Sequence, residues 1–169
     1  MFKSLGLVAV PLLTLAAPAQ AMVLGPDAAV CAPGSSAPAA LVTVDGFKAH
    51  TGNLRVQVYG PNPDEFLEKG KWLKRIDLPV TRDGPMQICV ALPHAGNYAI
   101  AVRHDVNGTG KSDWNDGGGF SRNPRLSLFS LKPAHSAVVM GFGAVPKPVN
   151  IVLNYRQGLS IGPIRTAQR

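Results

Sequence analysis

The sequence has few charged side chains, few aromatic side chains and only two cysteines. Charged residues make up 16% of its 169 residues, and aromatic residues make up 7%. It has no Cys-x-x-Cys pair and no histidine beside either cysteine, which argues against a catalytic thiol. Its four histidines show no zinc-binding spacing, and it carries no internal repeat and no nucleic-acid-binding module. Thiol catalysis, a histidine zinc site and nucleic-acid binding are therefore disfavoured.

Long helical patterns are also missing. Few windows keep an apolar period of 3.6 residues, and 15 prolines and 18 glycines supply frequent turn signals. Strand-like alternation is present instead, for example in Leu54, Val56 and Val58. We predict an all-β fold, an antiparallel β-sandwich of about seven strands, immunoglobulin-like or prealbumin-like, with little helix. The expected strands cover residues 40–47, 53–60, 72–80, 86–92, 97–105, 136–142 and 149–155, and one short helical turn is expected at 65–69.

The first 21 residues have the three parts of a signal peptide in order. Lys3 supplies the positive charge, an apolar core begins at Leu5, and "AQA" ends in a small residue at Ala21. The apolar part is too short and too interrupted by proline to span a membrane comfortably. We predict cleavage after Ala21 and a periplasmic or secreted location. A buried N-terminal strand or helix is the alternative.

The rest of the chain is expected to form one domain. Residues 22–38, rich in Ala, Pro, Gly and Ser, are predicted to be a flexible N-terminal segment. The sandwich domain is predicted at 39–156, and a C-terminal tail at 157–169. The formal net charge is +7, but the basic residues are scattered along the sequence. A solvated surface is therefore favoured over weak contact with anionic envelope polymers.

The two cysteines, Cys31 and Cys89, form an even pair after the predicted cleavage site. In an oxidising compartment such a pair indicates a disulfide bond. Two buried free thiols are the alternative. In the strand expected at 86–92, Cys89 points away from the face that carries Ile88 and Val90, so the N-terminal segment can reach it.

The stretch from Asp105 to Asp116 resembles a calcium-binding loop. The calcium pattern places Asp at position 1, Asp or Asn at 3 and 5, Gly at 6 and an acid at 12. Counting from Asp105, these positions hold Asn107, Thr109, Gly110 and Asp116. The predicted ligands are Asp105, Asn107, Thr109, Lys111 through its carbonyl, Asp113 and Asp116.

The same loop has a second interpretation without a metal ion. Asn and Asp side chains in a long hairpin loop form turns with their own backbone. Thr109 and Asp116 are also weak substitutes for the Asp and Glu of the pattern, and Arg103, Lys111 and Arg122 repel a cation. The sequence leaves both interpretations open.

Three further motifs carry less information. "GLSIG" around Ser160 matches a nucleophile elbow, but no acid and no histidine follow it, so it is rejected. "GGGF" at 117–120 is expected to be flexible backbone. Trp72, Trp114 and Tyr59 fit either a sugar-binding surface or, as favoured here, ordinary packing.

Several runs of residues resemble the bacterial family called domain of unknown function 2141. The first run contains Gly96, Tyr98, Ala99, His104, Asp105, Asn107, Gly108, Gly110 and Asp113, followed by Gly119, Phe120, Ser121, Asn123 and finally Tyr155. Thr109 departs from the family's usual Asn. The resemblance covers most of residues 40–155 and implies an exported single-domain protein without established biochemistry. It is also similar to transthyretin-like and carboxypeptidase-regulatory-like sandwich modules, which implies an accessory or binding role.

The sequence thus predicts an exported, non-enzymatic β-sandwich module that has a binding or structural role in the cell envelope. Its partner would be an envelope protein or glycan, and the 105–116 loop would bind Ca²⁺ weakly. One alternative is an envelope glycan hydrolase that uses Asp105 and Asp113 near His104. The other is a purely structural domain without a ligand.

Overall fold

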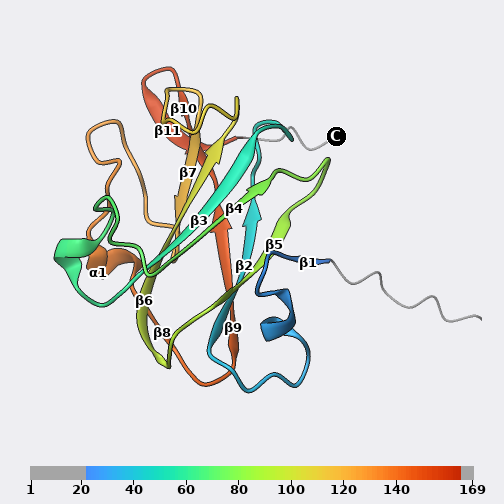
Figure 1. Ribbon diagram of the computed structural model, residues 1–169. Coiled ribbons are helices and arrows are strands. Elements are labelled where there is room, and N and C mark those ends of the chain that lie inside the picture. The colour runs from blue at the N-terminus through green and yellow to red at the C-terminus, as the bar shows by residue number, and fades with distance from the viewer. Residues whose placement is uncertain (1–21, 165–169) are drawn as a thin grey trace, which may run out of the picture.

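The computed structural model describes residues 22–164, so the predicted signal peptide at 1–21 lies outside the described residues. Two sheets of four and seven strands pack face to face, which confirms the predicted β-sandwich (Figure 1). The described part contains more strands than the expected seven. They are β1 (Val23–Leu24), β2 (Ala39–Asp45), β3 (Asn53–Tyr59), β4 (Lys74–Pro79), β5 (Met86–Ala91), β6 (Gly96–Asp105), β7 (Gly117–Phe120), β8 (Met140–Phe142), β9 (Pro146–Val152), β10 (Asn154–Gln157) and β11 (Ser160–Pro163). The helices are short: η1 (Ala28–Cys31), η2 (Pro63–Glu65) and α1 (His135–Val138).

The four-stranded sheet has the order β1-β5-β2-β9. β2 and β5 are antiparallel, whereas β2 pairs with β9, and β1 with β5, in parallel. A parallel pair needs a long connection, and here most of the domain lies between β2 and β9. β9 ends the sheet, and its Val152 N–H donates to the Asn123 side chain, which also donates to the Asn150 carbonyl. Asn123 therefore occupies the hydrogen-bonding groups of an edge strand.

The seven-stranded sheet has the order β11-β10-β7-β6-β3-β4, with β8 paired to the beginning of β6. β9 and β10 are separated only by Leu153, yet they belong to different sheets. The chain crosses from one sheet to the other at this residue, which is fully buried and whose N–H donates to the Asp45 carbonyl at 2.9 Å. The prediction of one continuous strand at 149–155 is therefore wrong.

The main core lies between the sheets and follows the period-2 alternation. Leu54, Val56 and Val58 of β3 are buried, and they face residues such as Val42 and Ile88 from the other sheet. Burial of these branched side chains supplies most of the driving force that holds the two layers together.

A second, smaller core covers the middle of the outer face of the seven-stranded sheet. Its centre is Phe66, whose ring makes edge contacts with Tyr59 and Phe120. Val138 of α1 completes this core, and α1 lies with the connection before β4 on the left of Figure 1. Ser121, which is fully buried, accepts from the Ile100 N–H and donates to the Val138 carbonyl at 2.6 Å. The second core thus fixes α1 to β6.

Four local predictions are corrected by the structure. The expected strand at 136–142 begins as α1 and becomes β8 only at Met140. "GGGF" at 117–120 is strand β7 rather than flexible backbone. The helical turn expected at 65–69 is η2, three residues long and two residues earlier. Part of the predicted C-terminal tail forms β11, which pairs with β10.

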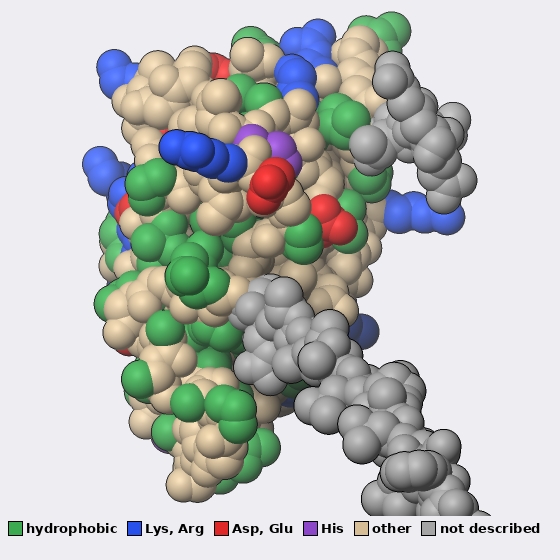
Figure 2. Space-filling model, turned by 90° about the vertical axis from the view of Figure 1, so that its right-hand side faces the viewer, with side chains coloured by type: hydrophobic (Ala, Val, Ile, Leu, Met, Phe, Trp, Pro, Cys, Tyr) green, Lys and Arg blue, Asp and Glu red, His purple; other side chains and the backbone are tan. Residues whose placement is uncertain are grey.

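The side of the molecule where β1 and β5 lie carries little clustered charge. Figure 2 shows Lys and Arg side chains mainly at the margins of this face, while uncharged and hydrophobic surface fills much of its lower half.

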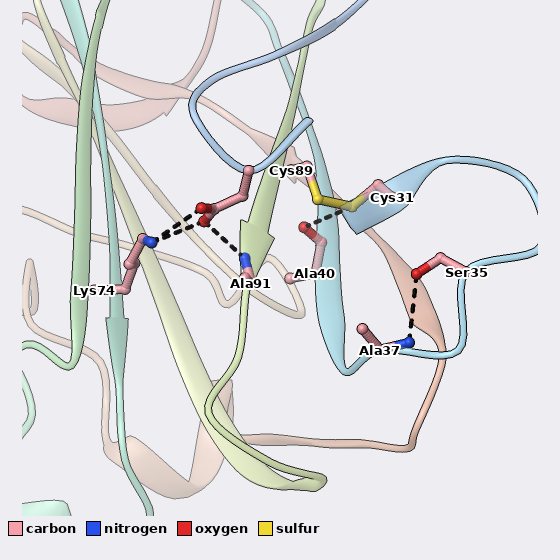
Figure 3. The surroundings of a disulfide bond; sticks show 8 residues. Cys31, Ser35, Ala37, Ala40, Lys74, Cys89 and Ala91 are labelled. Carbon is pink, nitrogen blue, oxygen red and sulfur yellow. Dashed lines mark hydrogen bonds and ion pairs between the residues drawn. A yellow bond between two sulfur atoms is a disulfide. The ribbon is translucent and has the colours of Figure 1, made fainter. Parts of the chain in front are cut away.

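Cys31 of η1 and Cys89 of β5 form the predicted disulfide bond, with Cα atoms 5.8 Å apart (Figure 3). The Asp27 carboxylate, four residues before Cys31, accepts from the Ala91 N–H at 2.9 Å and pairs with Lys74 Nζ at 3.0 Å. Residues 22–38, expected to be a flexible segment, thus contain β1 and η1 and have specific contacts with both sheets.

Candidate functional site

The loop 105–116 connects β6 to β7 at one end of the sandwich. β6 and β7 are antiparallel partners, with His104 opposite Gly117, so the loop closes a long hairpin. Thr51 donates its hydroxyl to the Val106 carbonyl at 3.0 Å. Gly52, with φ +71°, lies so close to the Asp105 carbonyl oxygen that any Cβ would overlap it. The first residues of the loop are therefore held by the chain just before β3.

Asp105 organises the first half of the loop. Its side chain is 3% exposed, and its two oxygens accept from the N–H groups of Thr109 at 3.1 Å and Gly110 at 2.7 Å. Arg103 Nη2 lies 3.5 Å from the same carboxylate. Such bonds to backbone N–H groups are what a turn-forming Asp makes.

Asp113 and Asp116 organise the second half. Asp113 accepts from the Asn115 N–H at 2.7 Å and from the Asn107 amide at 2.6 Å, and these hydrogen bonds lower the pKa of its carboxyl. Asp116 accepts from the N–H groups of Val106 and Asp113. Burial nevertheless raises the pKa of Asp116 above its usual value, and the neighbouring acids add to the rise.

The predicted calcium ligands all belong to this one loop, and three of them are carboxylates: Asp105, Asp113 and Asp116. Among residues 22–164, no group of three or more His, Cys, Asp or Glu side chains is arranged to hold a metal ion. The Lys111 carbonyl, a predicted ligand, accepts from the Thr109 hydroxyl at 3.3 Å. Each carboxylate oxygen that accepts one backbone N–H keeps a second lone pair, so these hydrogen bonds by themselves do not decide whether an ion binds. Calcium binding stays a prediction, and the present geometry is that of the alternative, a self-bonded turn.

His104 and Tyr155 form a buried pair beneath the loop. The Tyr155 hydroxyl lies 2.6 Å from His104 Nδ1, and His104 Nε2 lies 2.8 Å from the Thr51 carbonyl. Because a carbonyl only accepts, Nε2 carries the proton and Nδ1 accepts from Tyr155. The Tyr155 oxygen also accepts from the Lys48 N–H. Burial lowers the pKa of His104 and raises the pKa of Tyr155 to about 12, so both groups are neutral near pH 7.

This pair bears on the hydrolase alternative. His104 bonds with Tyr155 on the core side, whereas Asp105 bonds with its own loop, because neighbouring residues of a strand point to opposite faces. The Asp105 oxygens are occupied by backbone N–H groups. Neither group is placed to act as a general acid or base on a substrate.

Two of the three glycines of β7 lie where neighbouring side chains leave no room for a Cβ atom. A Cβ at Gly117 would overlap the Tyr155 ring, and a Cβ at Gly119 would come within 2.6 Å of Ile151. Gly118 faces the other way, and a Cβ there would meet only the Val102 carbonyl, at 3.8 Å. β7 is therefore glycine-rich because the core side chains of β9 and β10 approach its backbone.

A hollow of about 170 Å³ lies beside the loop, on the outer face of the seven-stranded sheet. We call it the Trp114 hollow. Trp114 is 71% exposed, and the Arg156 guanidinium lies over its ring at 4.4 Å from the centroid. The lining combines four polar side chains with apolar ones from the loop, from β7 and β11 and from the segment after β7: Asp113, Asp116, Asn154 and Arg156 with Trp114, Phe120, Leu126, Leu131 and Ile161.

The other aromatic candidates behave differently. Tyr59 is 2% exposed and packs in the second core, and Trp72 is partly buried against the same cluster. The packing interpretation therefore holds for these two residues, but Trp114 is a surface aromatic. Sequence reasoning missed Asn154 and Arg156, because only the pairing of β10 with β7 brings them beside the loop.

Ser160, in the rejected nucleophile motif, begins β11 and donates to the Gln157 carbonyl at 2.9 Å. The motif forms a tight hairpin between β10 and β11 rather than a strand-turn-helix elbow. The rejection is confirmed.

A comparison with protein families gives one match. The model of a family described as "Uncharacterized protein conserved in bacteria" matches residues 42–149, which confirms the resemblance drawn from the sequence. No curated protein and no solved structure matches the chain. Within the described range 22–164, no helix is both long and apolar enough to cross a membrane.

Proposed function

The chain belongs to the bacterial family called domain of unknown function 2141. We propose that it is an exported, non-enzymatic glycan-binding module of the cell envelope. The ligand would be a sugar ring of an envelope glycan, held in the Trp114 hollow. The observation that carries this proposal is the exposed Trp114 beside four polar side chains: Asp113, Asp116, Asn154 and Arg156.

The chemistry of the hollow suits a sugar. The indole offers an apolar surface for the C–H groups of a pyranose ring, while carboxylate, amide and guanidinium groups can bond with its hydroxyls. The cation–π contact with Arg156 holds the indole in place before a ligand arrives, which lowers the entropic cost of binding. Asp113, with its lowered pKa, is an acceptor over a wide pH range.

Export is supported by two independent features. The sequence of residues 1–21 has the order of a signal peptide. The Cys31–Cys89 disulfide is typical of proteins outside the reducing cytoplasm. Fractionation of cells that produce the full chain, with N-terminal sequencing of the product, tests export. A cytoplasmic product that still begins at Met1 would contradict it.

Glycan binding is tested by calorimetric titration with a neutral oligosaccharide of β-1,4-linked N-acetylglucosamine, which offers the sugar rings of an envelope glycan without carboxylate groups. We expect Trp114→Ala to lose binding by about tenfold or more, in line with the loss of a central aromatic contact. Phe129→Ala is the matched control, because Phe129 is a fully exposed aromatic residue that lies outside the Trp114 hollow, so its loss should leave binding unchanged. Equal affinity of the wild type and Trp114→Ala would overturn the proposal.

Calcium is not required by this function, and it has its own test. Terbium is titrated into metal-free protein with excitation of Trp114. If the loop binds calcium, emission appears, is displaced by calcium and is lost when Asp105 and Asp113 are both changed to Asn. Absence of emission, together with a melting temperature that calcium does not raise, would leave the loop as a self-bonded turn.

A further inference from the structure

The outer face of the seven-stranded sheet carries a cluster of arginines on the other side of the loop. Arg55 of β3 and Arg103 of β6 are directly opposite each other in the strand register. Arg75 of β4 lies next to Arg55, diagonally across the β3–β4 pair. Like charges opposite each other in adjacent strands are unfavourable unless something compensates for them.

The acidic groups nearby compensate only in part. Asp77 alone is shared by two arginines, accepting from Arg55 Nε at 2.7 Å and Arg75 Nε at 2.6 Å. These bonds lower the pKa of Asp77 although burial opposes the change. Both bonds use the Nε atoms, so the terminal guanidinium nitrogens of Arg55 and Arg75 make no hydrogen bond within residues 22–164.

Arg103 adds an unsatisfied donor to the cluster. Its terminal nitrogens donate to the Ser112 hydroxyl at 2.7 Å and to the Gly110 carbonyl at 3.1 Å. Its Nε atom is buried and has no hydrogen-bond partner within the described chain. Among the side-chain nitrogen and oxygen atoms that the structure describes, it is the single one in this situation. A buried donor without a partner is uncommon, and it shows that the acceptors around this cluster are fewer than its donors.

Two hollows meet at these three arginines and form one groove. One hollow, of about 470 Å³, extends toward Trp72 and Lys69 at the edge of the second core. The other, of about 340 Å³, extends toward Gly108 and Gly110 of the loop. We call this the arginine groove. No residue lining it lines the Trp114 hollow.

We propose that the arginine groove binds the anionic groups of an acidic polysaccharide. Its free guanidinium nitrogens match the oxygens of carboxylate or sulfate groups, and Arg binds such groups through paired hydrogen bonds. The partly buried Trp72, with Arg75 over its ring at 5.6 Å, offers an aromatic edge for a sugar ring. The two hollows line β3 from Asn53 to Tyr59, so the groove runs along the strand, and a ligand that follows it would be a chain. This proposal does not rest on the Trp114 hollow.

The test uses oligogalacturonate as the acidic probe and maltooligosaccharide as the neutral probe, measured by calorimetry at several salt concentrations. We expect the acidic probe to bind more tightly than the neutral probe, and this difference in affinity to shrink as salt rises. Arg55→Gln with Arg75→Gln should weaken it by about tenfold or more, as for loss of charged hydrogen bonds. Arg82→Gln with Arg125→Gln removes the same charge from exposed positions outside the groove and should have little effect.

Asp77→Asn gives a second readout that does not depend on losing a contact. It removes the negative charge that holds two arginines, so it should tighten binding of the acidic probe. A variant that was merely damaged would bind more weakly. Melting temperatures of all variants are measured beside the affinities, and if the Arg55/Arg75 pair fails to fold, Arg75→Gln alone and Asp77→Asn decide.

Three results would overturn the proposal: no preference for the acidic over the neutral probe, equal losses in the groove and control pairs, or weaker binding in Asp77→Asn. Vesicles containing phosphatidylglycerol form a separate arm. Groove-dependent binding to these vesicles without binding to oligogalacturonate would assign the arginine groove to a lipid surface instead. Failure of this test leaves the Trp114 titration unaffected, because the two sites share no residue.

Discussion

The most informative single change is Tyr155→Phe, which removes the hydroxyl that connects β10 by hydrogen bonds to β6 and to the segment before β3. The Tyr155 hydroxyl donates to His104 Nδ1 and accepts from the Lys48 N–H. The ring itself is 1% exposed and packs over Gly117, so phenylalanine would keep the apolar contacts. The substitution therefore isolates the hydroxyl.

The expected cost follows from what loses its partner. His104 is fully buried, and Nδ1 would keep a lone pair without a donor. Leaving a buried polar group unsatisfied costs about 1–3 kcal/mol. For a chain of this size, a loss of about 2 kcal/mol lowers the melting temperature by roughly 4–8 °C.

The assay is urea unfolding followed by circular dichroism, with thermal melting as a second measurement. A stability within about 0.5 kcal/mol of the wild type, the range of an ordinary surface substitution, would refute the reasoning. It would mean that water or a shifted side chain replaces the hydroxyl at no cost. The variant should still bind ligands in the Trp114 hollow, since Tyr155 does not line it.

Three further predictions concern the buried histidine, the glycines of β7 and the disulfide bond. Burial lowers the pKa of His104 in the folded protein, so the unfolded chain binds a proton first as the pH falls. The free energy of unfolding should therefore decrease below about pH 6.5, the pKa of an unperturbed histidine. In urea melts at a series of pH values, His104→Gln should weaken this pH dependence between about pH 5 and 7. Gly117→Ala should destabilise the protein by about 1–3 kcal/mol, because the new Cβ would overlap the Tyr155 ring. Gly118→Ala should change stability little, because its Cβ would make only an ordinary contact with the Val102 carbonyl, so equal melting temperatures for the two variants would contradict this packing argument. Replacing Cys31 and Cys89 together with Ala should cost about 2–4 kcal/mol, and denatured, unreduced wild type should show no titratable thiol.

The sequence predicted those parts of the fold that leave a side-chain pattern. The alternation of Leu54, Val56 and Val58 located β3 to within one residue, because every second side chain enters the core. The same logic placed Cys89 on the face opposite Ile88, where η1 brings Cys31 to it. Side-chain alternation is a local property, so a single sequence is enough to read it.

The missed parts depend on distant contacts. β7 has no pattern of its own, because glycine has no side chain, and the need for Gly117 becomes visible only once Tyr155 is placed over it. Likewise, the apolar run from Val149 to Tyr155 has the composition of one strand. Nothing local marks Leu153 as the point where the chain changes sheets.

The candidate sites show the same limit. The calcium spacing could be counted from Asp105 onward, because those residues are neighbours in the sequence. The Arg55–Arg103 juxtaposition depends on strand register across 48 residues, and the partnership of Trp114 with Arg156 depends on where β10 pairs. Sequence reasoning therefore found the loop and missed both hollows beside it.

The position of the loop between the two hollows affects how its variants must be interpreted. Ser112 and Gly110 hold Arg103 in the arginine groove, while Asp113, Trp114 and Asp116 form a wall of the Trp114 hollow. Asp105 fixes the backbone of the first half by accepting from Thr109 and Gly110. Changing Asp105 to Ala would release that backbone and disturb Arg103, whether or not an ion binds. Loss of terbium binding in that variant is therefore no evidence for calcium. Asp113→Asn is the more informative single change, because Asp113 lies outside the bonds that hold Arg103 and the backbone of the first half of the loop.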